Sequence, residues 1–242
     1  PICKMNIKRL KLIYGIVCIV LLQGLQAYAA NRYWVGNNSN KNWNTTANWS
    51  ATSGGAAGAS VPGASDSVYF NSGGVGQVIL DINITVLKLT MESSYTDTIK
   101  QNGKAITTTV NGMLLNGGTF LGSTGNIVVS GHLIIAGTNF ISTSSVLTIS
   151  RDYYFTSGSF IHNNGTVRFS GAATQNTRII SGSTNFYDLL LSPSANIVYL
   201  FNTASIFNVS HALYLSGSYQ IRIDGGTINV QGDIIHTGII SV

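Results

Sequence analysis

The feature that most constrains the fold is a repeat of constant length, about 20 residues, in the middle of the chain. Three stretches align without gaps: "GMLLNGGTFL" from Gly112, "HLIIAGTNFI" from His132 and "DYYFTSGSFI" from Asp152. A unit of this length cannot bury its own apolar face, so successive units must stack on one another. The repeat therefore predicts a solenoid.

Within each unit, short apolar runs are bounded by Gly, Asn and Ser, which is typical of strands and turns rather than helices. Two rows of residues are in register across the three units: Phe120, Phe140 and Phe160, and Ser130, Ser150 and Ser170. Residues one period apart lie about 4.8 Å apart on neighbouring parallel strands. We therefore predict an all-β fold, a right-handed parallel β-helix of roughly eight coils, with a phenylalanine stack inside and a serine ladder at a turn.

The repeat loses its register after residue 171 and resumes at Asn208 and Asn229, with a slightly longer period. A β-sandwich has turns every 8–12 residues but no fixed repeat, and a propeller blade needs about 40–50 residues. The gapless repeat favours the β-helix over both. We assign residues 76–242 to β-helix repeats and expect them to be truncated at the C-terminus.

The first residues have the pattern of a secretory signal peptide. Basic residues precede an apolar run from Leu12 to Leu22, and Ala27-Tyr28-Ala29 forms a cleavage site. The run is shorter than the roughly 20 residues of a membrane-spanning helix. We therefore predict a signal peptide with upstream residues over 1–29, cleavage near Ala29/Ala30, no transmembrane segment in the mature chain, and a secreted or cell-surface protein that passes through secretion machinery.

Removal of this segment changes what the composition allows. The formal net charge falls from +5 to +1 because four basic residues lie before the cut, so nucleic acid is not an expected partner. Cys3 and Cys18 also lie before the cut, which leaves the mature chain without a disulfide, a thiolate nucleophile or a Cys-based metal site.

All three tryptophans, Trp34, Trp43 and Trp49, lie in the Trp-, Asn- and Gly-rich segment 30–75. Two interpretations compete for them. Aromatic rings beside asparagine amides could stack on sugars and bind their hydroxyl groups, giving a carbohydrate-binding module. Alternatively, large aromatic side chains could cover the open end of the solenoid as an N-terminal cap. The position directly before the first coil favours the cap.

Catalytic patterns are scarce. The chain has eight acids, and no two of them fall in register at the period of the central repeat, whereas glycoside hydrolysis needs two carboxylates about 5–10 Å apart. The four histidines, His132, His162, His211 and His236, show no metal-binding spacing. We therefore predict no catalytic residue, no metal and no cofactor, with a carbohydrate-active β-helical enzyme as the alternative.

Residues 32–71, "RYWVGNNSNKNWNTTANWSATSGGAAGASVPGASDSVYFN", resemble the N-terminal motif of large secreted, adhesin-like surface proteins of the Bacteroidota. "NFYDLLLSPSANIVYL", from Asn185, is similar to a second motif of these proteins. The resemblance implies β-helical repeats, type IX secretion, and attachment to a polysaccharide or a cell-surface ligand without catalysis. Such proteins often end in a sorting domain that this chain lacks, so we expect an N-terminal fragment.

Overall fold

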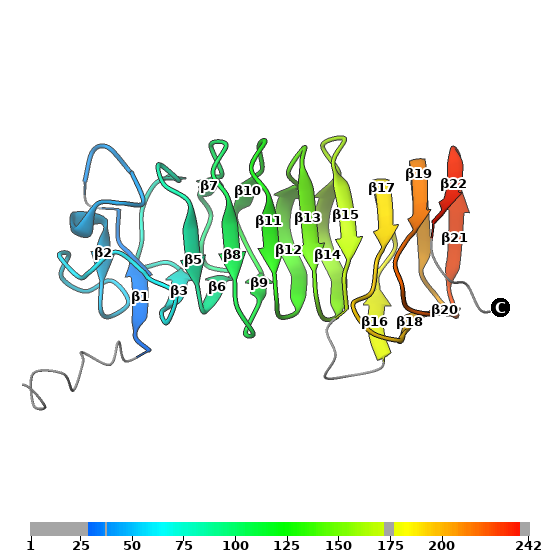
Figure 1. The fold of residues 1–242 in the computed structure, drawn as a ribbon. Helices are drawn as coiled ribbons and strands as arrows, with labels where there is room; N and C mark the ends of the chain where they lie inside the picture. Colours follow the sequence, from blue (N-terminus) through cyan, green and yellow to red (C-terminus); the bar gives the residue numbers. More distant parts are fainter. Residues whose placement is uncertain (1–28, 37, 172–176, 238–242) are drawn as a thin grey trace, which may run out of the picture.

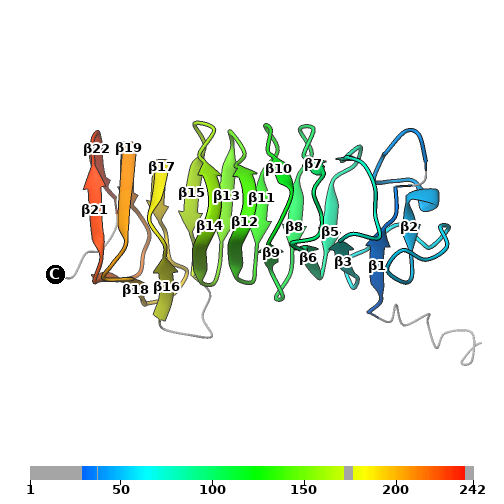
Figure 2. The ribbon, with the colours of Figure 1, turned by 180° about the vertical axis from the view of Figure 1, so that it is seen from behind.

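The computed structural model describes residues 29–36, 38–171 and 177–237, so the predicted signal peptide, except for Ala29, lies outside the described residues. The chain forms a parallel β-helix of about 8 turns with about 21 residues per turn, which confirms the predicted fold class. Neighbouring strands follow one another along a single axis from β1 to β22 (Figures 1 and 2). Within the described residues, no helix is long and apolar enough to cross a membrane.

The elements, in chain order, are β1 (Asn31–Trp34), η1, a 3-10 helix (Thr46–Asn48), β2 (Trp49–Ser50), β3 (Ser67–Phe70), β4 (Val78–Ile79), β5 (Ile84–Val86), β6 (Lys88–Met91), β7 (Thr98–Lys100), β8 (Ile106–Thr108), β9 (Met113–Leu115), β10 (Thr119–Leu121), β11 (Ile127–Val129), β12 (Leu133–Ile141), β13 (Val146–Ile149), β14 (Tyr153–Ile161), β15 (Thr166–Phe169), β16 (Thr177–Ser181), β17 (Thr184–Leu191), β18 (Ile197–Phe201), β19 (Ile206–Leu215), β20 (Ile221–Asp224), β21 (Thr227–Val230) and β22 (Asp233–His236).

The coil has three faces. The first face runs through β3, β6, β9, β12, β14, β16, β18 and β20. The second face contains β4, β7, β10 and the second halves of β12 and β14, and the third contains β5, β8, β11, β13 and β15. Because β17 and β19 are long, their first halves lie on the second face and their second halves on the third. β21 continues the second face and β22 continues the third.

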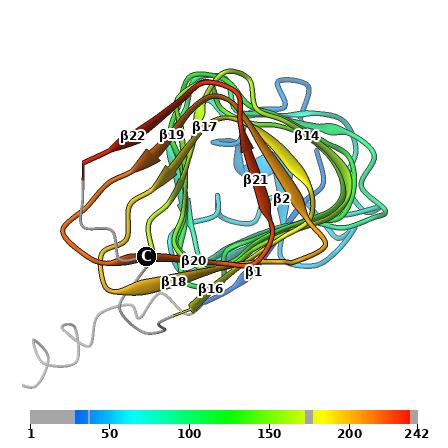
Figure 3. The ribbon, with the colours of Figure 1, turned by 90° about the vertical axis from the view of Figure 1, so that its right-hand side faces the viewer.

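The coil is right-handed. Figure 3 views the axis from the C-terminal end, and the last coil there runs anticlockwise from β20 through β21 to β22. The chain advances toward the viewer along the same path, because the C-terminal strands are the nearest ones in this view.

The phenylalanine stack inside the coil and the serine contact at a turn are both present. Phe120 and Phe140 stack with ring centroids 5.1 Å apart, and Phe140 and Phe160 follow at 5.6 Å. The hydroxyl groups of Ser150 and Ser170 lie 3.0 Å apart at the turn. Parallel pairing places residues one period apart on adjacent rungs, so the sequence repeat becomes a stack of like side chains.

The loss of register after residue 171 has a structural counterpart. Leu147 pairs with Val167, which is one period of the central repeat later, whereas Tyr153 pairs with Ile180, which lies well beyond one such period. The later coils are also longer than the central ones, as the pairing of Asp188 with Ala212 shows. The fold continues through this region because the strands pair even where the connecting segments lengthen.

The N-terminal segment is continuous with the coils. β1 and β3 already belong to the first face and pair in parallel, while β2 pairs antiparallel with β1 at the edge of that sheet. Asn48 is buried in the segment, accepting the N–H of Asn38 at 2.8 Å and donating to the carbonyl of Asn42 at 2.9 Å. This segment therefore adds an antiparallel edge strand and buried side chains to the first coil.

Candidate functional site

The three tryptophans of the carbohydrate-binding hypothesis form one buried cluster. The ring centroids of Trp34 and Trp49 lie 5.2 Å apart, those of Trp43 and Trp49 4.7 Å apart, and Phe70 packs 6.0 Å from Trp49. The edge-to-face geometry of the tryptophan pairs is a favourable arrangement for aromatic rings. Trp49 donates its indole N–H to the carbonyl of Trp43 at 2.7 Å.

The burial of this cluster favours one of the two interpretations of the tryptophans. All three side chains have an exposed fraction of 0%, so no ring face is available to stack on a sugar. The indole N–H groups of Trp34 and Trp43 have no hydrogen-bond partner, which is a cost that the packing of the rings must offset. The burial of the three tryptophans supports the cap interpretation. A ligand site is therefore expected on the outer faces of the coil instead.

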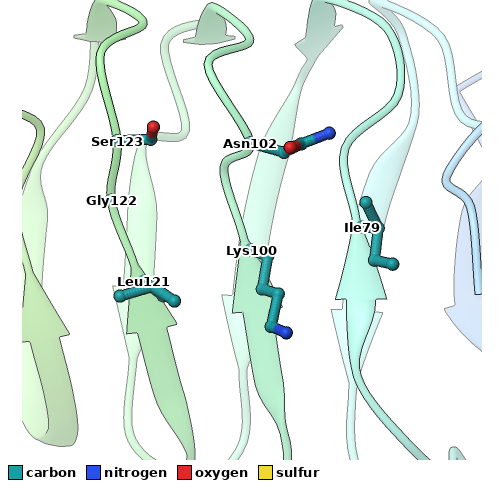
Figure 4. A pocket seen from close by; sticks show the side chains of 6 residues that line it. All are labelled: Ile79, Lys100, Asn102, Leu121, Gly122 and Ser123. Atoms are coloured by element: carbon teal, nitrogen blue, oxygen red, sulfur yellow. The ribbon is translucent and has the colours of Figure 1, made fainter.

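The first candidate site is a groove of about 400 Å³ on the second face, lined by Ile79, Lys100, Asn102, Leu121, Gly122 and Ser123. In Figure 4 the side chains of Ile79, Lys100 and Leu121 come from neighbouring strands at one level, and Asn102 and Ser123 lie beyond them at the turn. An open apolar floor with a few polar groups at its edge is the usual character of a ligand site.

This groove lies on a row of residues that continues along the axis. Ile79 pairs with Lys100, and the row then passes through Leu121, Ile141 and Ile161. Leu121 is 40% exposed and Ile161 is 48% exposed. A parallel polar row lies two residues earlier on each strand: Thr98, Thr119, Asn139 and Ser159.

The second candidate site is a groove of about 310 Å³ farther along the same face, lined by His162, Asn185, Phe186, Asn208, Ser210 and Gln231. Phe186 packs 5.7 Å from Phe160 inside the coil, which places the first half of β17 after the second half of β14. Asparagine amides form a ladder across three coils there, because Asn208 donates to Asn185 at 2.7 Å and Asn229 donates to Asn208 at 3.1 Å.

An aromatic pair stands beside the asparagine ladder, at the corner between the second and third faces. The rings of Tyr187 and His211 are parallel, with centroids 4.7 Å apart, and the ring of His162 lies 5.6 Å from Tyr187. Nδ1 of His211 lies 2.7 Å from a carboxylate oxygen of Asp188, and the His211 side chain is 55% exposed. Aromatic faces beside amide, imidazole and carboxylate groups can bind both the ring and the hydroxyl groups of a sugar.

A β-bulge creates this corner. Phe186 pairs with Val209 and Asp188 pairs with Ala212, so β19 has one residue more than β17 between these positions. The extra residue leaves both Ser210 and His211 exposed. Bulges commonly turn side chains outward at functional sites. The constant register of the central repeat does not contain this extra residue, so the sequence repeat gives no sign of the aromatic pair.

Two of the acids share a row in the longer coils near the C-terminal end of the described residues. Asp188, Ala212 and Asp233 are consecutive members of one outer row on the third face. The prediction that no two acids are in register applied to the period of the central repeat, and this pair shares a row at the longer period of the later coils. Asp188 and Asp233 are two rungs apart, so their α-carbons are separated by about 9.6 Å.

Other titratable groups lie apart from this corner. Asp152 accepts the N–H of Ile179 at 2.9 Å and has its other oxygen 3.2 Å from Nδ1 of His132. Arg178, whose pKa is lowered by burial, donates to the carbonyl of Ser150 at 3.1 Å. These contacts join β16 to the preceding coil. Within the described residues, no group of three or more His, Asp, Glu or Cys side chains is arranged to hold a metal ion.

Comparison of the chain with protein-family models, with curated proteins and with solved structures gave no match. The fold defines a right-handed β-solenoid protein, whose candidate ligand grooves both lie on the outer surface of the second face.

Proposed function

We propose that this chain is a secreted or cell-surface, adhesin-like β-solenoid that attaches to polysaccharide without catalysing its cleavage. The observation that carries the proposal is the corner where Tyr187 and His211 stack beside the ladder of Asn185, Asn208 and Asn229. Such a site offers the exposed ring of His211, held in place by Tyr187, for a pyranose ring, and amide groups for its hydroxyls at a regular spacing.

The architecture supports attachment because it is rigid and periodic. Each coil contributes one rung to the outer rows, so ligand groups one rung apart meet chemically similar side chains. The interior stack of phenylalanines and the strand pairing hold these rungs in place before a ligand arrives. Preorganisation of this kind lowers the entropic cost of binding a flexible polymer.

Affinity electrophoresis of the folded protein in gels containing single polysaccharides tests the proposal. We expect at least one linear polysaccharide to slow the wild type and Tyr187→Ala to weaken that interaction by about tenfold, which corresponds to about 1.4 kcal/mol. Tyr219→Ala is the matched control because Tyr219 is 44% exposed and lies in a turn outside both grooves. Absence of retardation in every gel, or equal loss for both variants, contradicts the proposal.

A carbohydrate-active enzyme is the second candidate, and the spacing of Asp188 and Asp233 favours it. Their separation of about 9.6 Å between α-carbons is near the upper end of the carboxylate separation of inverting glycosidases, about 6.5–9.5 Å. Release of reducing sugar by the wild type that is lost in Asp188→Asn and in Asp233→Asn establishes this function. Retardation without any sugar release supports the attachment protein instead.

A further inference from the structure

We propose that both grooves belong to one elongated binding surface, and that its ligand is a linear anionic polysaccharide lying along the solenoid axis. This inference rests on the proposed function, which it extends by naming the ligand class and the path of the ligand chain. Two observations support it: the continuity of the second face and the charge in the first groove.

The second face is continuous from one groove to the other. Its interior row passes from Phe140 through Phe160 to Phe186 and Phe207, with successive ring centroids 5.6, 5.7 and 6.3 Å apart. The outer rows therefore run in the same direction. From Lys100 the path crosses Leu121, Ile141 and Ile161 and then reaches the level of Tyr187. The distance from Lys100 to Tyr187 along the axis is four rungs, or about 19 Å.

The outer rows present two kinds of surface side by side. The row from Leu121 to Ile161 is aliphatic and partly exposed, whereas the adjacent row of Asn139 and Ser159 is polar. A pyranose chain also has apolar C–H faces and polar hydroxyl edges. A chain that lies along the axis can therefore place its C–H faces on the aliphatic row and its hydroxyls on the polar row.

Lys100 supplies the charge. Within the described residues its ammonium group takes part in neither an ion pair nor a hydrogen bond. Asp97 accepts the N–H of Gly76 at 2.8 Å and Asp81 accepts the N–H of Asn44 at 2.9 Å, and neither carboxylate forms an ion pair with Lys100. An unpaired cation in a groove with an amide and a hydroxyl at its edge is complementary to a carboxylate or sulfate group on the ligand.

Two pairs of polysaccharides with the same backbone test the ligand class: polygalacturonate with its methyl ester, and carboxymethylcellulose with hydroxyethylcellulose. We expect an acidic member to bind more tightly than its neutral partner, and this preference to shrink as salt is added. Lys100→Gln should weaken binding of the acidic member about two- to fivefold, as expected for a partly exposed ion pair. Lys88→Gln, which changes a half-buried lysine on the first face, should have no effect.

Charge reversal in the middle of the path tests its continuity. Leu121→Asp should weaken binding of the acidic polymer about tenfold by placing a like charge beneath it. Leu200→Asp is the matched control, because Leu200 is also 40% exposed but lies on the first face. The circular dichroism spectra and unfolding midpoints of both variants must match, so that any difference in binding reflects position.

The outcomes separate the two proposals. Equal binding of acidic and neutral polymers, or normal binding by Lys100→Gln and Leu121→Asp, overturns the anionic ligand and the long path. If Tyr187→Ala still weakens binding in that case, the attachment function stands. If no linear polysaccharide binds the wild type, both proposals fail together.

Discussion

Replacing Trp49 by alanine removes the central ring of the cap, and we expect the first coil to lose most of its stability. Trp49 is fully buried and packs against Trp34, Trp43 and Phe70. Truncation of a buried tryptophan costs about 3–5 kcal/mol. The change also leaves the carbonyl of Trp43 without its indole donor, a loss that costs about 1–3 kcal/mol. Trp49→Phe also removes this hydrogen bond but keeps an aromatic ring, so it leaves a smaller cavity than Trp49→Ala.

The loss should be local because coils of a solenoid interact mainly with their neighbours. We expect hydrogen–deuterium exchange in Trp49→Ala to become fast in β1, β2 and β3 while β17 and β19 remain protected. Urea unfolding followed by circular dichroism should show a lower midpoint for the cap transition. Tyr219→Ala, a change at an exposed tyrosine, should stay within about 0.5 kcal/mol of the wild type. Wild-type exchange and unfolding in Trp49→Ala, together with lost polysaccharide binding, would refute the cap and restore the sugar platform.

Three further predictions concern the interior and the N-terminus. Phe140→Ala should destabilise the central coils by about 3–5 kcal/mol, and Phe160→Ala by less, because Phe140 is fully buried and Phe160 is half-buried; equal urea midpoints for the two variants would argue against the stack. Burial raises the pKa of three phenols above its ordinary value: Tyr95, Tyr153 and Tyr199. Above a pH of about 10, these tyrosines release their protons in the unfolded chain but keep them in the folded one. The free energy of unfolding should therefore fall by up to about 1.4 kcal/mol per pH unit per tyrosine. Urea midpoints that stay constant up to a pH of about 12 would contradict this prediction. If residues 1–29 direct export, N-terminal sequencing of the exported protein should begin at Ala30, and a sequence that begins at Met5 would contradict cleavage.

The central coils could be predicted from sequence because their repeat has a constant length. Parallel pairing converts a fixed spacing directly into vertical contact, so Phe120, Phe140 and Phe160 had to stack once the chain formed a solenoid. The chemistry of the tryptophans alone left two functions open for them. Their burial follows from the closure of the first coil, which depends on contacts between residues far apart in the sequence, such as Trp49 and Phe70.

The candidate site could not be predicted because it lies where the repeat changes length. Tyr187 and His211 are separated by more than one period of the central repeat, and a bulge in β19 brings their rings together. A signal was present in "NFYDLLL", "NVSHALYL" and "NVQGDIIH", whose first asparagines are Asn185, Asn208 and Asn229. Aligning these three segments on asparagine, with variable coil lengths, would have revealed the ladder and placed His211 beside its middle asparagine, Asn208.

The central claim is that the outer surface of the second face, and not the tryptophan cluster, carries the polysaccharide. Hydrogen–deuterium exchange of the full chain, with and without a polysaccharide that retards it in electrophoresis, tests this most directly. We predict slower exchange in the first halves of β17 and β19 and in β21, and no change across residues 31–50. Protection centred on Trp34, Trp43 and Trp49, with none in β17, β19 and β21, would contradict the claim.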